Sequence, residues 1–331
     1  MRVVNNDSFL QGFRSIWSYE QIKYSKANLP YKCLAILLIY LFLTLIPWIW
    51  RHYLWFLFDI FPKTLVMCLS LFLLHVIFHS SANFIYFYLY KAKIPFFEQF
   101  RINHDKLWPW EKNPENWIKV YKKTMKMLFV QQYILFPLTT VPFVFSNFCK
   151  ARIDLESFPT KTEIIGQLII LMLCDDFYNY WIHRLFHFKF FYTWIHKQHH
   201  EYIIPISISA EYAHPIEVIF LNLAAPMIGV VILGDKMHFM TLVIWTMIKS
   251  VEPVIVHAGY DFPWDFTKIL PFSAPASFHD YHHTHNIGNF SSFFTFWDIM
   301  LSSGIFFVDY LEKRDEKKRK VKGKQERREL S

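Results

Sequence analysis

Three long runs without a charged residue constrain this chain more than any other feature. The runs Cys33–Trp50, Thr64–Tyr90 and Met127–Cys149 contain 18, 27 and 23 residues with no Asp, Glu, Lys or Arg. About 20 apolar residues cross the hydrocarbon core of a bilayer as a helix, so each run is long enough to be a membrane span. The alternative is a set of helices buried in a large soluble core. An apolar content of 53% and only 8 glycines in 331 residues favour the membrane.

The runs therefore predict an all-α integral membrane protein with about four transmembrane helices plus a short hairpin. We expect spans at about 33–57, 64–90, 127–148 and 163–182, and a hairpin made of 217–233 and 237–251. The predicted organisation is a cytosolic N-terminal segment (1–31), transmembrane and interfacial helices (32–160), a histidine-rich region (161–305) and a basic cytosolic tail (306–331). If the N-terminus is cytosolic, this span count places the histidine-rich segments and the tail on the cytosolic face.

The charge of the chain is concentrated near its end. There are 35 Lys and Arg against 27 Asp and Glu, a net charge of +8, and residues 312–329 contain ten basic and five acidic side chains. Such a run in a membrane protein is typical of a cytosolic segment near anionic headgroups, so we expect no nucleic acid as a partner.

Twelve of the sixteen histidines fall between 183 and 285, and eight of them form three clusters. The clusters are HRLFH at 183–187, HKQHH at 196–200 and HDYHH at 279–283. Histidines at i, i+3 and i+4 project from neighbouring faces of a helix, where they can share a metal. Histidine near lipid is costly without a partner, so this density indicates a common function. We expect no role in the site for the isolated His52, His75, His79, His104 and His238.

The number and type of these ligands narrow the choice of metal. Eight imidazoles exceed the needs of one metal ion and fit a binuclear site. Zinc usually takes four ligands, and calcium and magnesium prefer oxygen. A nitrogen-dominated pair with open positions suits iron that reacts with O2, although zinc could occupy the same site in the isolated protein.

These clusters and the segments around them resemble the fatty acid hydroxylase/sterol desaturase superfamily, and most closely the C-4 methylsterol monooxygenases (methylsterol oxidases). The resemblance also rests on Asp176 before the first cluster and on the RINHDKLWPWE, AEYAHPIE, HAGYDFP, IGNFSS and FWD segments, and it covers roughly residues 85–300. It implies that 161–305 is a fatty acid hydroxylase-type catalytic domain, in a multi-pass protein of the endoplasmic reticulum membrane.

The resemblance also implies a chemistry and a ligand set. Relatives of this kind use two iron ions, O2 and NAD(P)H electrons, usually delivered through cytochrome b5 or a reductase, to oxidise a C–H bond of a sterol or other lipid. The matching metal ligands are His183, His187, His196, His199, His200, His257, His279, His282 and His283. Three further residues, His214, Glu252 and Asp176, could bind a metal or support a ligand.

Two positions depart from the pattern of relatives. Phe278 and Asn179 stand where methylsterol oxidases and other relatives often have histidine. The first choice is oxidation of the C-4 methyl group of methylsterols. The alternatives are a sterol C-5 desaturase or side-chain dealkylase, a lipid hydroxylase, and, from another class, a membrane scaffold that has lost catalysis.

Overall fold

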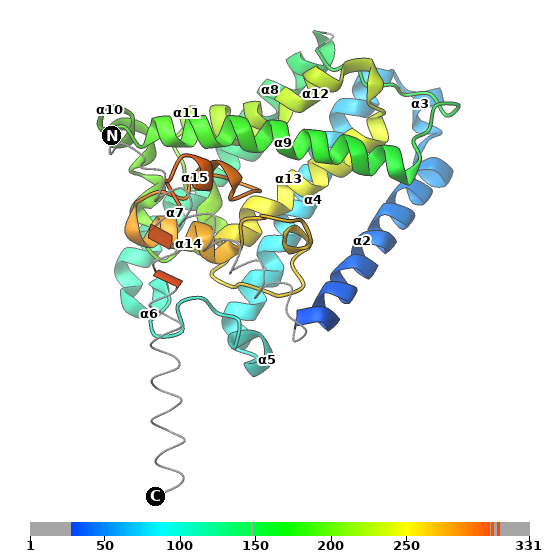
Figure 1. The fold of residues 1–331 in the computed structure, drawn as a ribbon. Helices are drawn as coiled ribbons and strands as arrows, with labels where there is room; N and C mark the ends of the chain where they lie inside the picture. Colours follow the sequence, from blue (N-terminus) through cyan, green and yellow to red (C-terminus); the bar gives the residue numbers. More distant parts are fainter. Residues whose placement is uncertain (1–27, 147, 305, 308–309, 312–331) are drawn as a thin grey trace, which may run out of the picture.

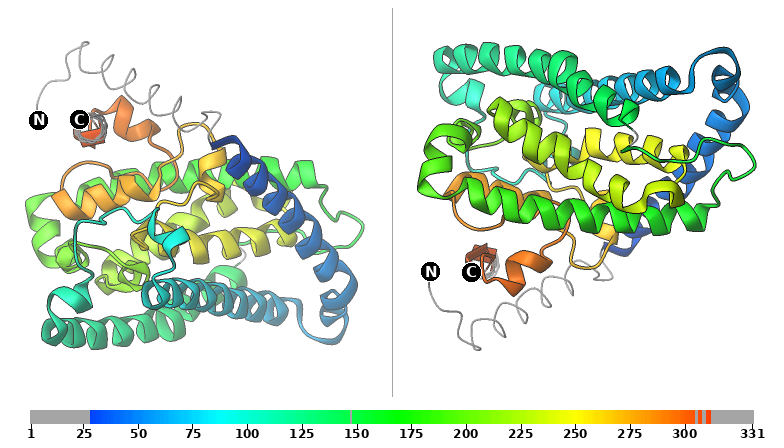
Figure 2. Two further views of the ribbon diagram at one scale, coloured as in Figure 1. Left: turned by 90° about the horizontal axis from the view of Figure 1, so that it is seen from below. Right: turned by 90° about the horizontal axis from the view of Figure 1, so that it is seen from above.

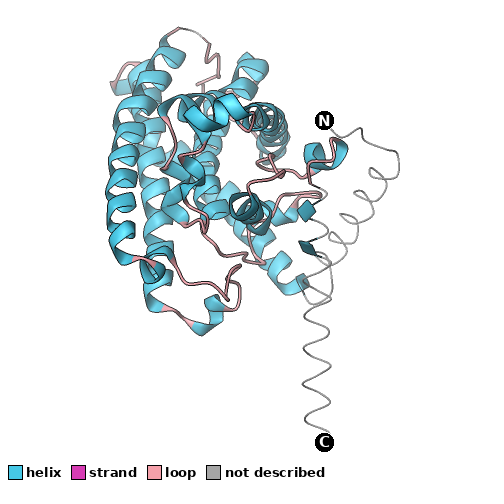
Figure 3. Cartoon of the chain, turned by 90° about the vertical axis from the view of Figure 1, so that its left-hand side faces the viewer, coloured by secondary structure: helices cyan, strands magenta, loops and turns pink. Residues whose placement is uncertain are grey.

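The computed structural model describes residues 28–146, 148–304, 306–307 and 310–311. Within these ranges the chain is helical, and its only extended pairings are three isolated bridges. The predicted all-α class is confirmed (Figure 3). Most of the predicted 1–31 segment and of the 306–331 tail lies outside the described residues, and the division of the chain into regions stays a prediction.

Five helical runs in the described part of the chain are long and apolar enough to cross a membrane. They are Leu29–Ile60, Lys63–Ala92, Pro114–Phe145, Pro215–Lys236 and Phe239–His257. They contain α2 (Leu29–Ile49), α4 (Lys63–Ala92), α7 (Pro114–Val130), α8 (Phe136–Phe145), α12 (Ala225–Leu233) and α13 (Phe239–His257). The first three match predicted spans, and both halves of the predicted hairpin reach spanning length. The protein is therefore a multi-pass membrane protein.

The fourth predicted span forms the long helix α9 (Lys161–Phe186), which is not among those five runs. Its second half carries Asp175, Asp176 and Asn179, all buried, and these polar residues lower its hydropathy. The helix begins at Thr160, whose side chain caps the amide of Glu163 in a capping box. Figures 1 and 2 show α9 running along the length of the molecule.

The start of α9 lies at one end of the helical bundle, where three connections between helices come together. There the amide of Arg152 donates to the carbonyl of Met237 at 2.8 Å, and the amide of Phe239 donates back to Arg152 at 2.7 Å. Trp55 stacks on His238 with ring centroids 5.7 Å apart. The α2–α4, α8–α9 and α12–α13 connections thus meet at one end. The other end receives the C-terminus of α9, so α9 carries the chain back across the bundle.

Helix α13 forms the centre of the bundle, between α4 on one side and α9 with α12 on the other. Val243, Ile244 and Val254 of α13 are fully buried at 0% exposure. On the α12 side, a Cβ at Gly229 would lie 2.9 Å from Leu171 Cδ2, so only glycine allows α12 and α9 to pack this closely. At the far end of α13, His257 packs against His279, whose ring also lies 6.2 Å from that of His183 near the C-terminus of α9.

Candidate metal centre

Nine histidines come together where α9 and α13 end. Helix α9 carries His183 and ends at His187, the segment from η4 (Tyr192–His196) to η5 (His199–Glu201) supplies three, α13 supplies His257, and α14 (Ala276–His285) supplies three. The first group is His183, His187, His196, His200 and His282; the second is His199, His257, His279 and His283. Within each group, the candidate ligand atoms lie within 4.8 Å of one another. All nine are the residues that the sequence predicted as ligands.

The sequence clusters do not map onto the two groups one by one. In HKQHH, His196 and His200 belong to the first group and His199 to the second. In HDYHH, His279 and His283 belong to the second group and His282 to the first. Residues i and i+4 lie about 40° apart around a helix, whereas i+3 lies on the other side of residue i, about 60° away. The i+3 histidine of each cluster therefore turns to the other group, and the two groups interlock.

The imidazoles of each group face one another through nitrogen lone pairs. The Nδ1–H of His183 donates to the carbonyl of Phe290 at 2.9 Å, and the Nδ1–H of His257 donates to Pro253 at 2.7 Å. A carbonyl only accepts, so the Nε2 atom of each of these neutral rings keeps its lone pair. Yet Nε2 of His183 lies 3.1 Å from Nε2 of His196, and Nε2 of His257 lies 3.0 Å from Nε2 of His279. Each group thus places an imidazole nitrogen with a free lone pair beside several other imidazole nitrogens, and this donor set fits a metal ion in each group.

Burial keeps these rings in the form that binds metal. Burial, followed by repulsion from His183 and His257, lowers the pKa of His200 to about 3. Burial and the neighbouring imidazoles also hold the pKa of His282 well below its usual value. At neutral pH the metal-free rings are therefore neutral ligands.

The IGNFSS segment holds two of these imidazoles through its backbone. The carbonyl of Gly288 accepts from Nδ1 of His282 at 2.5 Å, and that of Phe290 accepts from His183. Gly288 has φ +57°, and a Cβ there would lie 1.9 Å from the Ser303 carbonyl oxygen, so only glycine fits.

Two buried carboxylates fix this loop. Oδ1 of Asp176 accepts from the amides of Ser292, Phe293 and Phe294 at 2.7–3.1 Å. Asp298 of the FWD segment accepts from the amides of Phe290 and Ser291 at 3.0 and 2.9 Å. Asp176 therefore supports the loop that orients His183 and His282, and it belongs to neither histidine group.

Two supporting contacts were not predicted from the sequence. Oε1 of Glu217, the last residue of AEYAHPIE, lies 2.9 Å from Nδ1 of His196, and both side chains are buried. Nδ2 of Asn103, in the RINHDKLWPWE segment, donates to both carboxylate oxygens of Asp280 at 2.8 and 2.9 Å, and so ties α14 in place. The resemblance of these segments to relatives was the available signal. Which side chain meets which imidazole depends on the fold.

Comparison with known proteins gives this geometry its context. Residues 168–303 match the sequence profile of the fatty acid hydroxylase family. The chain is 35% identical over 231 residues to methylsterol monooxygenase 1 of Gallus gallus, covering 70% of this chain and 74% of the relative. It is also 35% identical over 262 residues to a putative methylsterol monooxygenase of Dictyostelium discoideum, covering 78% and 93%. The chain belongs to the methylsterol monooxygenase family.

A shorter match within this family has a higher identity. The C-4 methylsterol oxidase of Schizosaccharomyces pombe is 43% identical over 148 residues, which cover 44% of this chain and 49% of the relative. No solved structure gives a significant match. Family membership together with the two histidine groups shows an oxidoreductase with a metal cofactor.

The two departures from the family pattern lie in different surroundings. Phe278 is 1% exposed and packs edge-on against Phe307, with ring centroids 5.2 Å apart, in an apolar cluster with Ala274 and Tyr281. This side chain lies outside both histidine groups, so its replacement of a histidine leaves them complete. Asn179 lies one turn before His183, and its Nδ2 donates to the Asp175 carboxylate at 3.0 Å.

The two remaining predicted site residues also stand apart from the ligand groups. The Nδ1 of His214 caps α11 (Pro215–Glu217) by accepting from the amide of Ile216 at 3.2 Å. Glu252 forms an ion pair with Lys249 at 3.1 Å and accepts from Ser292 at 3.2 Å. His214 therefore holds the helix that carries Glu217, and Glu252 contributes to the wall of the adjoining cavity.

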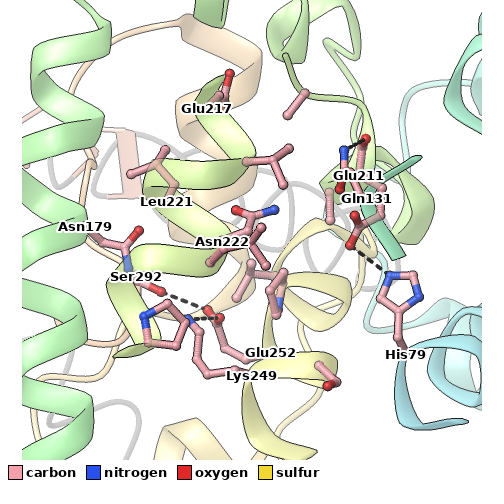
Figure 4. Close-up of a pocket in the computed structure, with 18 of the residues that line it drawn as sticks. His79, Gln131, Asn179, Glu211, Glu217, Leu221, Asn222, Lys249, Glu252 and Ser292 are labelled. Atoms are coloured by element: carbon pink, nitrogen blue, oxygen red, sulfur yellow. Dashed lines mark hydrogen bonds and ion pairs between the residues drawn. The ribbon is translucent and has the colours of Figure 1, made fainter. Parts of the chain in front are cut away.

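A cavity of ≈ 180 Å³ opens beside the metal centre, between α4, α8, α12 and α13. Members of both histidine groups line one end, and apolar side chains from the membrane helices line much of the rest, among them Leu71, Phe136, Val230 and Trp245. Two polar clusters interrupt this wall: Lys249 with Glu252, and His79 with Glu211 (Figure 4). His75 and His79, for which the sequence predicts no role in the site, also line this cavity, and neither belongs to a histidine group.

Proposed function

We propose that this protein is a membrane-bound di-iron monooxygenase that oxidises the C-4 methyl group of methylsterols with O2 and NAD(P)H-derived electrons. The observation that carries the proposal is the pair of interlocked histidine groups at the end of an apolar cavity inside a membrane bundle. The names of the relatives supply the substrate class and the reaction.

The nine grouped histidines are the proposed ligands, five for one metal and four for the other. The described residues that form the two groups are all histidines, with no thiolate and no carboxylate. Nitrogen ligands suit iron, and zinc would compete for the same positions in the isolated protein. When bound, two irons supply the redox chemistry that activates O2 towards an unactivated C–H bond.

The chain itself positions the substrate and keeps water away. The cavity lies among helices of spanning length, so a lipid substrate can reach it from the bilayer. Its apolar wall receives the rigid body of the substrate and holds one methyl group against the histidine end. Asp176, Glu217 and Asp298 fix the imidazoles and the loop behind them, so the metal ligands are held in place before substrate enters.

We further propose the endoplasmic reticulum membrane as the location, with the histidine groups and the tail on the cytosolic face. Net charge +8 and the basic run at 312–329 favour docking of an acidic electron donor such as cytochrome b5 on that face. The tail lies largely outside the described residues, so this support comes from the sequence.

Sterol analysis after deletion of the gene tests the substrate. Accumulation of 4-methylsterols, reversed by the wild-type gene but not by a His257→Ala variant, is the expected result. Accumulation of C-5-saturated or side-chain-alkylated sterols would instead identify another reaction of the superfamily. Full complementation by His257→Ala would indicate a scaffold, because His257 belongs to the second histidine group.

A further inference from the structure

The AEYAHPIE segment places a buried carboxylate in the wall of the cavity. Glu211 lies in η6 (Ser207–Glu211) and is 7% exposed. It lines the same cavity as His196, His199, His257 and His279. Neither histidine group includes Glu211.

One membrane helix contacts the Glu211 carboxylate, and the π-helical segment η3 (Gln131–Leu135) contacts its backbone. Oε1 of Glu211 lies 3.0 Å from Nε2 of His79, on α4, and Nδ1 of His79 lies 2.6 Å from Nε2 of Gln132. The neighbouring Gln131 donates to the backbone carbonyl of Glu211 at 2.6 Å. Figure 4 shows Glu211, His79 and Gln131 together on one side of the cavity. A buried carboxylate is costly without a partner, and its pairing with His79 beside the cavity points to a function.

The Glu211 carboxylate still has capacity to accept. Within the described residues its ion pair is with His79 through Oε1, and a carboxylate offers about four lone pairs, so it can accept further hydrogen bonds. Burial raises the pKa of Glu211, but the contact with His79, followed by His75 and His257, outweighs it, and the pKa lies below its ordinary value. Glu211 is therefore ionised at neutral pH and can only accept hydrogen bonds.

The charged groups of the other polar cluster in the wall are paired with one another. Lys249 lies 3.1 Å from a carboxylate oxygen of both Asp175 and Glu252. The second oxygen of Glu252 accepts from Ser292. These partners leave Glu211 as the better candidate for binding a ligand group.

We propose that the Glu211 carboxylate accepts a hydrogen bond from the hydroxyl of the substrate and selects alcohols with a methyl group on the adjacent carbon. This inference rests on the proposed function, because a sterol bears its hydroxyl on C-3, which is bonded to C-4. When the C-4 methyl group faces the histidine end, the hydroxyl must lie in the same end of the cavity, beside Glu211. His79 acts as a positioning residue that keeps the carboxylate ionised and aimed.

The selectivity follows from the acceptor-only character of a carboxylate. A 3-ketone or a 3-methyl ether of the same steroid has a hydrogen-bond acceptor but no donor. Its oxygen would lie against the carboxylate oxygen of Glu211 with no proton between them, which is repulsive. Sites built to hydrogen-bond a hydroxyl strongly reject analogues that lack it, because the buried group is left unpaired. The amide of a Glu211→Gln variant can donate, and the preference should weaken or reverse.

Turnover and binding of three matched ligands test this assignment. The full-length, metal-loaded protein in nanodiscs is given a 4,4-dimethyl-3-hydroxysteroid, its 3-ketone and its 3-methyl ether, and thermal shift reports binding independently of turnover. Wild type should favour the alcohol by at least roughly a hundredfold in kcat/KM, and Glu211→Gln should lose roughly ten- to a hundredfold on the alcohol while gaining on the ketone. Glu98→Gln is the control, because Glu98 contacts Tyr260 away from the cavity.

Each failure has a distinct meaning. Equal turnover and equal binding of the alcohol and the ketone by wild type would overturn the inference, even if Glu211→Gln failed to fold. An equal loss of activity on all three ligands in Glu211→Gln would also overturn it. So would a change of preference in Asn222→Leu, a substitution elsewhere in the cavity wall, with no change in Glu211→Gln. If wild type oxidises none of the three, the proposed function fails, and the binding ratios alone decide the role of Glu211.

Discussion

Replacing Glu217 by glutamine should weaken metal binding without unfolding the protein. The Glu217 carboxylate lies 2.9 Å from Nδ1 of His196, with side chains only 4% and 1% exposed. A partner that orients a metal-bound imidazole is typically worth about 10- to 100-fold in metal affinity. Glutamine keeps an oxygen of the same shape and loses only the charge, so the expected loss is at the lower end, roughly five- to thirtyfold, or about 1–2 kcal/mol at about 1.4 kcal/mol per tenfold. Glu217→Ala should lose up to roughly a hundredfold.

Competition of the purified protein against a chelator of known affinity measures this change, with metal per chain read by mass spectrometry. Glu201→Gln is the matched control. Glu201 follows His200 directly, yet its carboxylate accepts from the Tyr212 hydroxyl at 2.7 Å. If Glu217→Gln binds metal as tightly as wild type, the carboxylate does not orient His196 and the reasoning is refuted. An equal loss in Glu201→Gln would show a general weakening of the fold instead.

Three further perturbations have defined outcomes. Asp176→Asn should reduce metal affinity roughly tenfold, because it loosens the loop whose carbonyl orients His183; unchanged affinity in the chelator assay would contradict this. Phe278→His should leave metal content unchanged and lower the Tm, because it puts a polar ring into the apolar contact with Phe307; a rise in metal content would contradict it. The metal-free protein should lose stability as pH falls from about 6.5 towards 3, because His200 titrates near 6.5 when unfolded and near 3 when folded; a flat Tm over that range would contradict it.

The sequence could single out the histidines that the structure gathers, because histidine spacing is a local property; their role as metal ligands stays a prediction. The i, i+4 pairs such as His183 and His187 lie in one turn of chain, and helical geometry alone brings them together. The assignment of His199 and His282 to opposite groups was not predicted. It depends on how α9, α14 and the π-helical turn η4 meet, and this contact joins segments far apart in the chain.

The supporting residues were harder to predict for the same reason. Glu217 and Glu211 lie in a segment that resembles relatives, but nothing local says that one meets His196 and the other His79. His79 stands alone in an apolar run, and an isolated histidine in such a run is more often structural than functional. Its carboxylate partner, Glu211, lies more than 130 positions later in the chain.

Hydropathy predicted most of the membrane helices and was ambiguous for α9. The long uncharged runs became α2, α4 and the α7–α8 unit. Asp175 and Asp176 lower the hydropathy of α9, although it runs back along the bundle. Asp175 is paired with Lys249, and Asp176 accepts from the amides of the 292–294 loop. Tertiary contacts therefore accommodate polar groups whose low hydropathy argues against a membrane span when the sequence is considered alone.

Iron per chain in group-specific variants tests the central claim most directly. The wild-type protein loaded with iron should contain two irons per chain. His282→Ala should empty the first histidine group and His257→Ala the second, and each should retain about one iron, since the two residues belong to different groups. A wild-type content of one iron or less, or a variant in either group that keeps both irons, would contradict the proposed binuclear centre.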